Sequence, residues 1–167
     1  LKKFEPNFKK PELWKKNDLE KKKYFVLTLH RPSNVDDPKR LLEILKEIDR
    51  NCYNYKVIYP VHPRVYKILE NLDVNFKNII QTEALPYLNF NYLVKNARAV
   101  ITDSGGITEE ATMFKVPCLT LRKNTERPET VELGSNVLIK DFPKDFRIEM
   151  EKINCGNWKK SRIPDKW

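Results

Sequence analysis

The feature that most constrains this chain is a series of short, uninterrupted apolar runs separated by stretches with helical spacing. The runs do not alternate apolar and polar residues, which is typical of strands covered on both faces. They occupy residues 24–29, 56–61, 78–81, 99–102, 118–121 and 136–139. Because strands that alternate with helices form a parallel sheet, we predict a Rossmann-like three-layer α/β domain.

The segments between the apolar runs carry helix signals. Pro38 suits the first turn of a helix, and Leu41, Leu45 and Ile48 follow at helical spacing. Further helices are predicted over residues 64–71, 87–96 and 106–114, and we also expect one from about residue 11 to residue 23.

The positive charge of the chain, +9 in total, belongs mostly to its two ends. Residues 1–23 hold nine lysines and four acidic residues, and residues 140–167 hold eight basic and five acidic residues. We therefore expect a basic, partly helical flanking segment over 1–23, the Rossmann-like domain over 24–140, and a C-terminal extension over 141–167. An arm that binds a polyanion is the rival interpretation of these ends.

Composition excludes several classes of protein. An apolar fraction of 40% is too high for a disordered chain. We see no apolar run long enough for a membrane helix and no secretory leader, so we expect a cytoplasmic protein that does not bind membranes. Three separated cysteines predict neither a disulfide framework nor a zinc site, and two histidines without metal-ligand spacing predict no metal. The sequence contains no nucleic-acid-binding signature, so we expect no nucleic-acid partner.

Polar clusters follow the predicted strands, where ligands bind in parallel sheets. His30 and Arg31 follow the first strand, and His62 follows the second. The fourth strand leads into residues 103–106, and the fifth leads into the polar loop 122–129. A candidate ligand site is therefore predicted at the carboxyl edge of the sheet.

The run 102–106 (TDSGG) joins a predicted strand to a predicted helix. Gly105 and Gly106 remove side chains where a ligand can approach, and the helix N-terminus favours an anion. Ser104 adds a hydroxyl donor, so the run suits a diphosphate. The alternative is a tight turn with Ser104 as N-cap. A P-loop is excluded because its lysine is missing, and a nucleophile elbow because Thr102 replaces its first glycine.

Other polar residues at this edge have two interpretations each. Glu109 or Glu110 can accept hydrogen bonds from ribose hydroxyls, or both are a solvated acidic pair. Arg122 and Arg127 can neutralise a diphosphate, or they belong to an ordinary charged loop. His30 can assist a leaving phosphate, or it is structural.

Taken together, these segments resemble the C-terminal half of the non-hydrolysing UDP-N-acetylglucosamine (UDP-GlcNAc) 2-epimerases, in that family's order and spacing. The resemblance rests on residues 28–35 (TLHRPSNV), 60–64 (PVHPR), 102–110 (TDSGGITEE), 117–122 (PCLTLR) and 125–129 (TERPE). It covers roughly residues 24–140, and residues 163–167 (IPDKW) are similar to the family's segment before its last helix.

The resemblance implies one half of a two-domain GT-B fold, with the active site between two Rossmann-like halves. It implies the interconversion of UDP-GlcNAc and UDP-N-acetylmannosamine (UDP-ManNAc). The C2 proton is removed as UDP leaves, and UDP then adds back to 2-acetamidoglucal. No cofactor or metal is implied. The implied partners are UDP, UDP-N-acetylhexosamine, an N-terminal domain that this chain lacks, and a second copy in a homodimer.

The same resemblance assigns roles to residues of this chain. Ser104, Gly105, Gly106 and Arg127 hold the diphosphate, and His30 assists the leaving UDP. The remaining assignments concern the nucleoside and an activator. Glu110 binds ribose, Phe90 lies against uracil, the backbone near Leu85 reads the base edge, and Arg31 and His62 are candidates for binding a regulatory UDP-GlcNAc.

The chain also departs from the family. The carboxylates that act on the sugar belong to the N-terminal half, so the chain alone is expected to bind UDP weakly and to be inactive. Thr108 and Lys115 stand where glutamine and glycine are common. Three rival functions remain open: a hydrolysing epimerase, a GT-B glycosyltransferase, and a UDP-sugar-binding module without catalysis.

Overall fold

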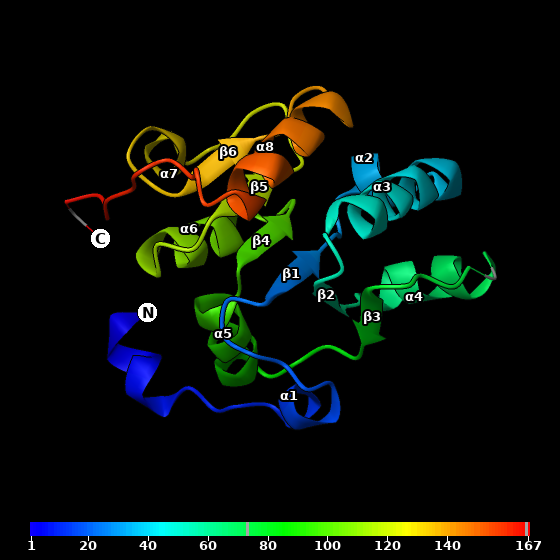
Figure 1. Ribbon diagram of the computed structural model, residues 1–167, viewed down its shortest axis with the longest axis horizontal. Helices are drawn as coiled ribbons and strands as arrows, with labels where there is room; N and C mark the ends of the chain where they lie inside the picture. The colour runs from blue at the N-terminus through cyan, green and yellow to red at the C-terminus, as the bar shows by residue number, and fades with distance from the viewer. Residues whose placement is uncertain (73, 166) are drawn as a thin grey trace.

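The computed structural model describes residues 1–72, 74–165 and 167, and it contains one all-parallel sheet of six strands (Figure 1). The strand order is β3-β2-β1-β4-β5-β6, which is a Rossmann-like topology. The strands are β1 (Tyr24–Thr28), β2 (Lys56–Pro60), β3 (Ile79–Thr82), β4 (Ala99–Thr102), β5 (Cys118–Thr120) and β6 (Asn136–Leu138). The predicted fold class is confirmed, and each strand lies within one residue of a predicted apolar run.

The helices predicted between the strands also form. They are α3 (Pro38–Asn51), α4 (Pro63–Glu70), α5 (Tyr87–Asn96) and α6 (Gly105–Met113). Asp37 caps α3, because its side chain accepts a hydrogen bond from the amide of Lys39 at 3.0 Å.

The remaining helical segments are shorter or lie near the ends. They are a 3-10 helix (Lys2–Asn7), α1 (Glu12–Lys16), α2 (Pro32–Val35), α7 (Pro128–Glu132) and α8 (Lys144–Asn154). The expectation of a helix from about residue 11 to residue 23 is wrong beyond Lys16. Asp18 and Lys22 have φ values of 45° and 61°, and such left-handed residues do not continue an α-helix.

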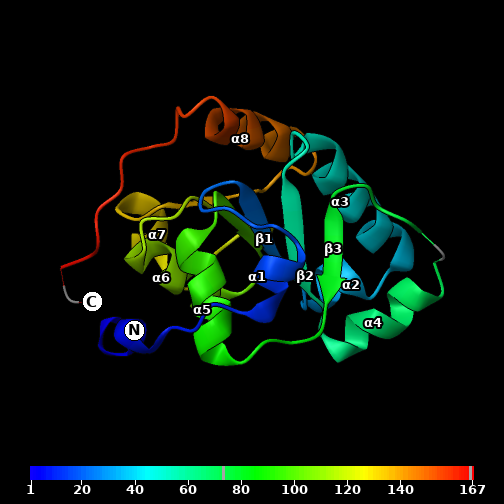
Figure 2. The same cartoon turned by 60° about the horizontal axis from the view of Figure 1, so that its bottom comes forward.

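Helices cover both faces of the sheet (Figure 2), and an apolar cluster lies on each face. On one face, α3, α4 and α8 cover Phe25, Leu27 and Tyr59. On the other face, α1, α5 and α6 cover Tyr24, Val26 and Val100. Because both faces are covered, the strands are apolar throughout, as their sequence pattern predicts.

Both ends of the chain pack against this sheet. Trp14 and Leu19 belong to the cluster under α5, and Phe146 and Met150 of α8 belong to the opposite cluster. The two termini lie side by side in both views, and Leu1 and Trp167 line the same hollow (Figures 1 and 2). Among the residues that the structure describes, no helix has the length and apolar character needed to cross a membrane.

Candidate functional site

The candidate site lies where the strand order reverses, between β1 and β4. These two strands are adjacent and parallel, and Thr28 pairs with Thr102 at their carboxyl ends. The hydroxyls of the two threonines lie 2.6 Å apart. The chain leaves β1 toward α2 and leaves β4 toward α6. In open α/β sheets the crevice between two such diverging loops is where ligands bind.

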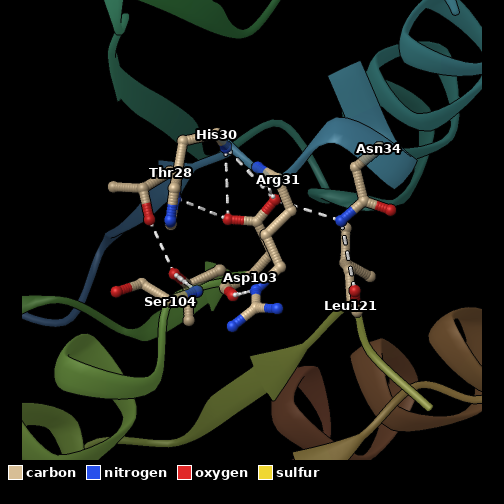
Figure 3. Close-up of polar contacts among 8 residues, drawn as sticks. Thr28, His30, Arg31, Asn34, Asp103, Ser104 and Leu121 are labelled. Carbon is tan, nitrogen blue, oxygen red and sulfur yellow. Dashed lines mark hydrogen bonds and ion pairs between the residues drawn. The ribbon is translucent and has the colours of Figure 1, made fainter. Parts of the chain in front are cut away.

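Asp103 links the loops that follow these two strands (Figure 3). Its side chain is fully buried and accepts hydrogen bonds from the amides of His30 and Arg31, at 3.1 and 3.0 Å to Oδ2. The Asn34 amide nitrogen donates to the same oxygen at 3.0 Å, and it also lies 3.2 Å from the carbonyl of Leu121. Three donors on one buried carboxylate fix the loop after β1 against the turn after β4.

Asp103 also orients the imidazole of His30. The Nδ1 atom of His30 lies 2.8 Å from Oδ1 of Asp103, while 47% of the His30 side chain remains exposed. Since the carboxylate is an acceptor, Nδ1 carries the proton in this contact, and Nε2 is the nitrogen left for a ligand. His30 is therefore a half-exposed side chain whose orientation is fixed by Asp103 at the carboxyl end of β1.

The N-terminus of α6 presents backbone donors to the crevice. Ser104 occupies the N-cap position, but its hydroxyl makes no capping hydrogen bond. Its amide donates to Oγ1 of Thr102 at 3.0 Å. The amides of Gly105, Gly106 and Ile107 have no acceptor within the helix, because the first turn of a helix lacks residues four positions earlier. An anion placed at this end would meet those donors and the positive end of the helix dipole.

The lack of side chains at Gly105 and Gly106 is not required by the fold. Apart from its two chain neighbours and the nearby backbone of its own helix, a Cβ atom on Gly106 would have no described atom within 4 Å. A Cβ on Gly105 would approach only Arg122 and Glu126, both at 4.0 Å. Neither glycine has a left-handed φ. The space beside the two glycines is therefore open to a ligand that binds at the N-terminus of α6.

Two arginines flank the glycines. Arg122 is nearly buried and makes two hydrogen bonds to the Glu126 carboxylate, at 2.8 and 2.6 Å. This pairing raises the pKa of Arg122 and lowers that of Glu126 to about 2. Arg127 is half exposed and forms an ion pair with Glu109 of α6. The predicted cationic loop thus lies beside the glycines, with each arginine already held by a carboxylate.

Glu110 lines a hollow on the α5 side of the glycines. The hollow has a volume of about 430 Å³, and its walls include Tyr87, Gly106, Glu109 and Glu110. Burial raises the pKa of Glu110, while hydrogen bonds from Asn91 and Tyr87 act in the opposite direction. Glu109 lines the same hollow but is paired with Arg127, so the two adjacent glutamates, which the sequence could not tell apart, differ in their partners.

A second hollow, of about 320 Å³, lies on the other side of Arg122. Arg31, Arg40, Arg122, Lys123 and Lys140 contribute to its walls. The two hollows share no lining residue: Gly106 lines the first and Arg122 lines the second. A Cβ on Gly105 would lie 4.0 Å from Nη1 of Arg122, so the cationic hollow places positive charge beside the candidate anion site.

The other predicted residues, Leu85, Phe90 and His62, line neither of these two hollows. Phe90 and Leu85 are half buried against the cluster under α5, and neither lines the hollow beside Glu110. His62 is exposed after β2, and its carbonyl accepts hydrogen bonds from Val65 and Tyr66. Within the described part of the chain, histidine, cysteine and acidic side chains form no group of three or more that could hold a metal ion.

Sequence reasoning missed several residues that build the site. Asn34 and Asp103 meet only because β1 and β4 are neighbours, although 69 positions separate them. Asn91 and Tyr87 were assigned to an ordinary helix, and their contacts with Glu110 join α5 to α6. The sequence shows an asparagine at position 91, but only the structure shows that it is fully buried. A buried amide needs hydrogen-bond partners, and that need points to Glu110.

The chain is similar to known proteins in sequence and in fold. A family model described as "UDP-N-acetylglucosamine 2-epimerase" matches residues 1–161. A UDP-N-acetylglucosamine 2-epimerase of Methanocaldococcus jannaschii is 43% identical over an alignment of 145 residues, and the match covers 81% of this chain and 40% of that protein. A UDP-2,3-diacetamido-2,3-dideoxy-D-glucuronate 2-epimerase of Pseudomonas aeruginosa is 34% identical over 80% of this chain and 37% of its own length.

A solved structure extends the similarity to three dimensions. The M. jannaschii UDP-GlcNAc 2-epimerase in complex with UDP-GlcNAc and UDP matches with a TM-score of 0.78 and 39% identity. The match covers 93% of this chain and 44% of that one. The chain therefore spans about two fifths of the length of the relatives it matches.

Proposed function

The chain belongs to the UDP-N-acetylglucosamine 2-epimerase family, and from this premise we propose that it supplies the UDP-binding half of an enzyme that interconverts UDP-GlcNAc and UDP-ManNAc. The site described above lies within one Rossmann-like domain, and the chain spans about 40% of its curated relatives. The carboxylates that act on the sugar would come from an N-terminal half, which would complete the active-site cleft.

The observation that carries the proposal is the open space at Gly105 and Gly106. Neither the backbone conformation nor packing within the described chain requires glycine at these positions. A ligand that comes into van der Waals contact with the backbone does require it. At a helix N-terminus, that ligand is an anion. A diphosphate meets both conditions.

In this proposal the diphosphate is held by Ser104, Gly105, Gly106 and Arg127. The helix amides and the Ser104 hydroxyl donate hydrogen bonds to phosphate oxygens. Arg127 is half exposed, so it would exchange its contact with Glu109 for one with a phosphate. Donors fixed in advance stabilise the charge that builds up on UDP as it leaves the sugar.

The ribose would occupy the hollow on the α5 side, and the uracil would extend beyond it toward Phe90 and Leu85, which do not line that hollow. Glu110 would accept hydrogen bonds from the ribose hydroxyls, because an ionised carboxylate has several free lone pairs. Phe90 would lie against uracil, and the backbone near Leu85 would read the edge of the base. Both residues lie on or just before α5, which packs beside α6.

His30 would act at the departing phosphate. As the C2 proton is removed, the bond between C1 and the phosphate oxygen breaks, its electrons stay with UDP, and C1=C2 forms. His30, held by Asp103 through Nδ1, would donate a hydrogen bond from Nε2 of its protonated ring to that oxygen. Asp103 stabilises the positive charge of the ring during this step.

The resemblance adds three finer proposals. Arg31 and His62 would contribute to binding a regulatory UDP-GlcNAc, since both lie at the ends of adjacent strands. The full-length protein would form a homodimer. It would act in the cytoplasm, where nucleotide sugars are consumed.

Titration calorimetry of the chain with UDP tests the proposed site. We expect a Kd of about 0.1–1 mM, and a five- to tenfold weaker Kd for Arg127→Ala, roughly the worth of one charge-assisted hydrogen bond at a half-exposed position. Arg50→Ala is the matched control, because Arg50 is an exposed arginine on α3, which covers the opposite face of the sheet from α6. It removes the same charge and should leave the Kd unchanged.

Two results would contradict the proposal. One is no heat of binding at millimolar UDP. The other is an equal loss of affinity for Arg127→Ala and Arg50→Ala, because that would indicate general charge attraction. If UDP binds as expected, adding an N-terminal half distinguishes an epimerase from a non-catalytic module. Only the epimerase would then convert UDP-GlcNAc to UDP-ManNAc, whereas a hydrolysing enzyme would release free sugar.

A further inference from the structure

Asn91 is a buried polar residue that packing alone does not explain. Its side chain is fully buried on α5. The Nδ2 atom donates to the carbonyl of Tyr87 at 3.2 Å and reaches Oε1 of Glu110 at 3.4 Å. The Oδ1 atom has no hydrogen-bond partner among the described residues. An unpaired buried oxygen costs free energy that a leucine of similar volume would avoid.

Tyr87 holds the same carboxylate from the preceding turn of α5. Burial and the neighbouring Glu110 carboxylate raise the pKa of the Tyr87 hydroxyl, so this hydroxyl interacts with Glu110 while about half of the residue stays exposed. Tyr87 and Glu110 both line the hollow beside Gly106. Two side chains of one helix therefore fix the orientation of a half-buried carboxylate on the next helix.

This arrangement leaves a defined set of acceptors for a ligand. A carboxylate offers about four lone pairs, and Asn91 and Tyr87 occupy two of them. The other two suffice for two neighbouring hydroxyls. A ligand that lacks one of the hydroxyls would leave a desolvated lone pair unsatisfied, and such sites discriminate strongly against it.

We propose that Asn91 and Tyr87 are positioning residues that aim Glu110 at the two ribose hydroxyls, so that the hollow selects ribonucleotides over deoxyribonucleotides. This inference rests on the proposed UDP site. The unpaired oxygen of Asn91 is then the cost of orienting Glu110, because local packing rules are broken where a ligand site gains from it.

The test compares UDP with 2′-deoxyuridine 5′-diphosphate by titration calorimetry, together with the melting temperature of each variant. The wild-type chain should bind UDP at least tenfold more tightly than the deoxy analogue. Asn91→Leu should keep or raise the melting temperature. It should weaken the binding of UDP about fivefold and leave the binding of the deoxy analogue nearly unchanged, so the ratio of the two dissociation constants falls to about two. A role in folding alone would move the melting temperature and not the ratio.

Two further variants make the test specific. Tyr87→Phe changes a half-exposed ring without disturbing the core, and it should also lower the ratio, by about threefold. Asn96→Leu is the matched control on the same helix, because the Asn96 amide donates to the Tyr92 carbonyl and is not bonded to Glu110 in the structure. It should leave the ratio at the wild-type value.

The outcomes separate this inference from the proposed function. If the wild-type chain binds neither nucleotide, the UDP site itself is wrong, and the inference falls with it. If the chain binds UDP and Asn91→Leu and Tyr87→Phe keep the wild-type ratio, only the positioning role is overturned. Equal binding of the two nucleotides by the wild-type chain also overturns it.

Discussion

Two glycine-containing turns, at opposite ends of the sheet, differ in why they contain glycine. Gly134 lies just before β6, at the amino end of a strand. A Cβ there would lie 2.6 Å from the Thr130 carbonyl and 2.7 Å from the Thr112 side chain. Gly106 lies after β4, at the carboxyl end, and a Cβ there would meet no described atom within 4 Å.

The difference separates a glycine needed for folding from one available to a ligand. Around Gly134 the chain itself fills the space, so glycine permits the close packing of α7 against α6. Around Gly106 the space is open, and the turn is instead held by Asp103 and its donors. The carboxyl-end turn is thus fixed by polar contacts, which leaves its glycines free for binding.

The largest effect is expected from Asp103→Ala, which removes what fixes the carboxyl-end turn. The amides of His30 and Arg31 and the Asn34 side chain lose their acceptor, so unfolding free energy should fall by about 2–4 kcal/mol. Chemical denaturation measures this change. Asp145→Ala is the control, because the partly exposed Asp145 also accepts two backbone amides and its loss should cost less than about 1 kcal/mol of unfolding free energy. If Asp103→Ala and Asp145→Ala lose the same unfolding free energy, the burial of Asp103 does not strengthen its contacts, which contradicts this prediction.

Gly134→Ala should have the next largest effect. The added methyl group meets a backbone carbonyl that cannot move without shifting α7, so we expect a loss of about 1–3 kcal/mol of unfolding free energy. The same denaturation experiment measures it. The affinity of the folded variant for UDP should stay unchanged, and a variant as stable as the wild-type chain would contradict the packing argument.

Gly106→Ala should act in the opposite direction on stability. The new methyl group has open space, and alanine loses less backbone entropy than glycine in a helix. We expect unfolding free energy to rise by about 0.4–1 kcal/mol. A fall in stability would show that the glycine serves the fold here too.

The smallest expected effect is a pH dependence from Glu110 beside these glycines. Burial raises its pKa, so the folded chain binds this proton more tightly than the unfolded chain does. Its stabilising contribution is complete below the ordinary glutamate value and is lost as pH rises through the raised value. Glu110→Gln should therefore gain melting temperature relative to wild type between about pH 4 and pH 7. A difference that stays constant with pH would contradict this cause.

The fold could be predicted from sequence because the periodic signals are strong. Runs such as residues 24–29 and 99–102 are apolar on both faces, and that pattern allows few architectures. The conformation of residues 17–23 could not be predicted. Asp18 and Lys22 adopt left-handed conformations there, and their residue types do not predict this. The packing of α8 depends on Phe146 and Met150 meeting α3 across the sheet face, which local sequence does not encode.

The candidate site was predictable only in part. The glycine turn could be found because strand, glycines and helix are consecutive in the chain. The role of Asp103 could not, because its donors lie about 70 residues away and meet it only through the pairing of β1 with β4. The same holds for Asn91, whose contact with Glu110 depends on the packing of α5 beside α6.

The most direct test of the account is the UDP affinity of Gly106→Ala, measured by calorimetry on the variant and the wild-type chain under the same conditions. The account predicts a more stable protein that binds UDP at least about tenfold more weakly, a loss of roughly 1.4 kcal/mol, because the methyl group occupies the place of the ligand. A variant that gains stability and binds UDP as tightly as the wild-type chain would contradict the central claim.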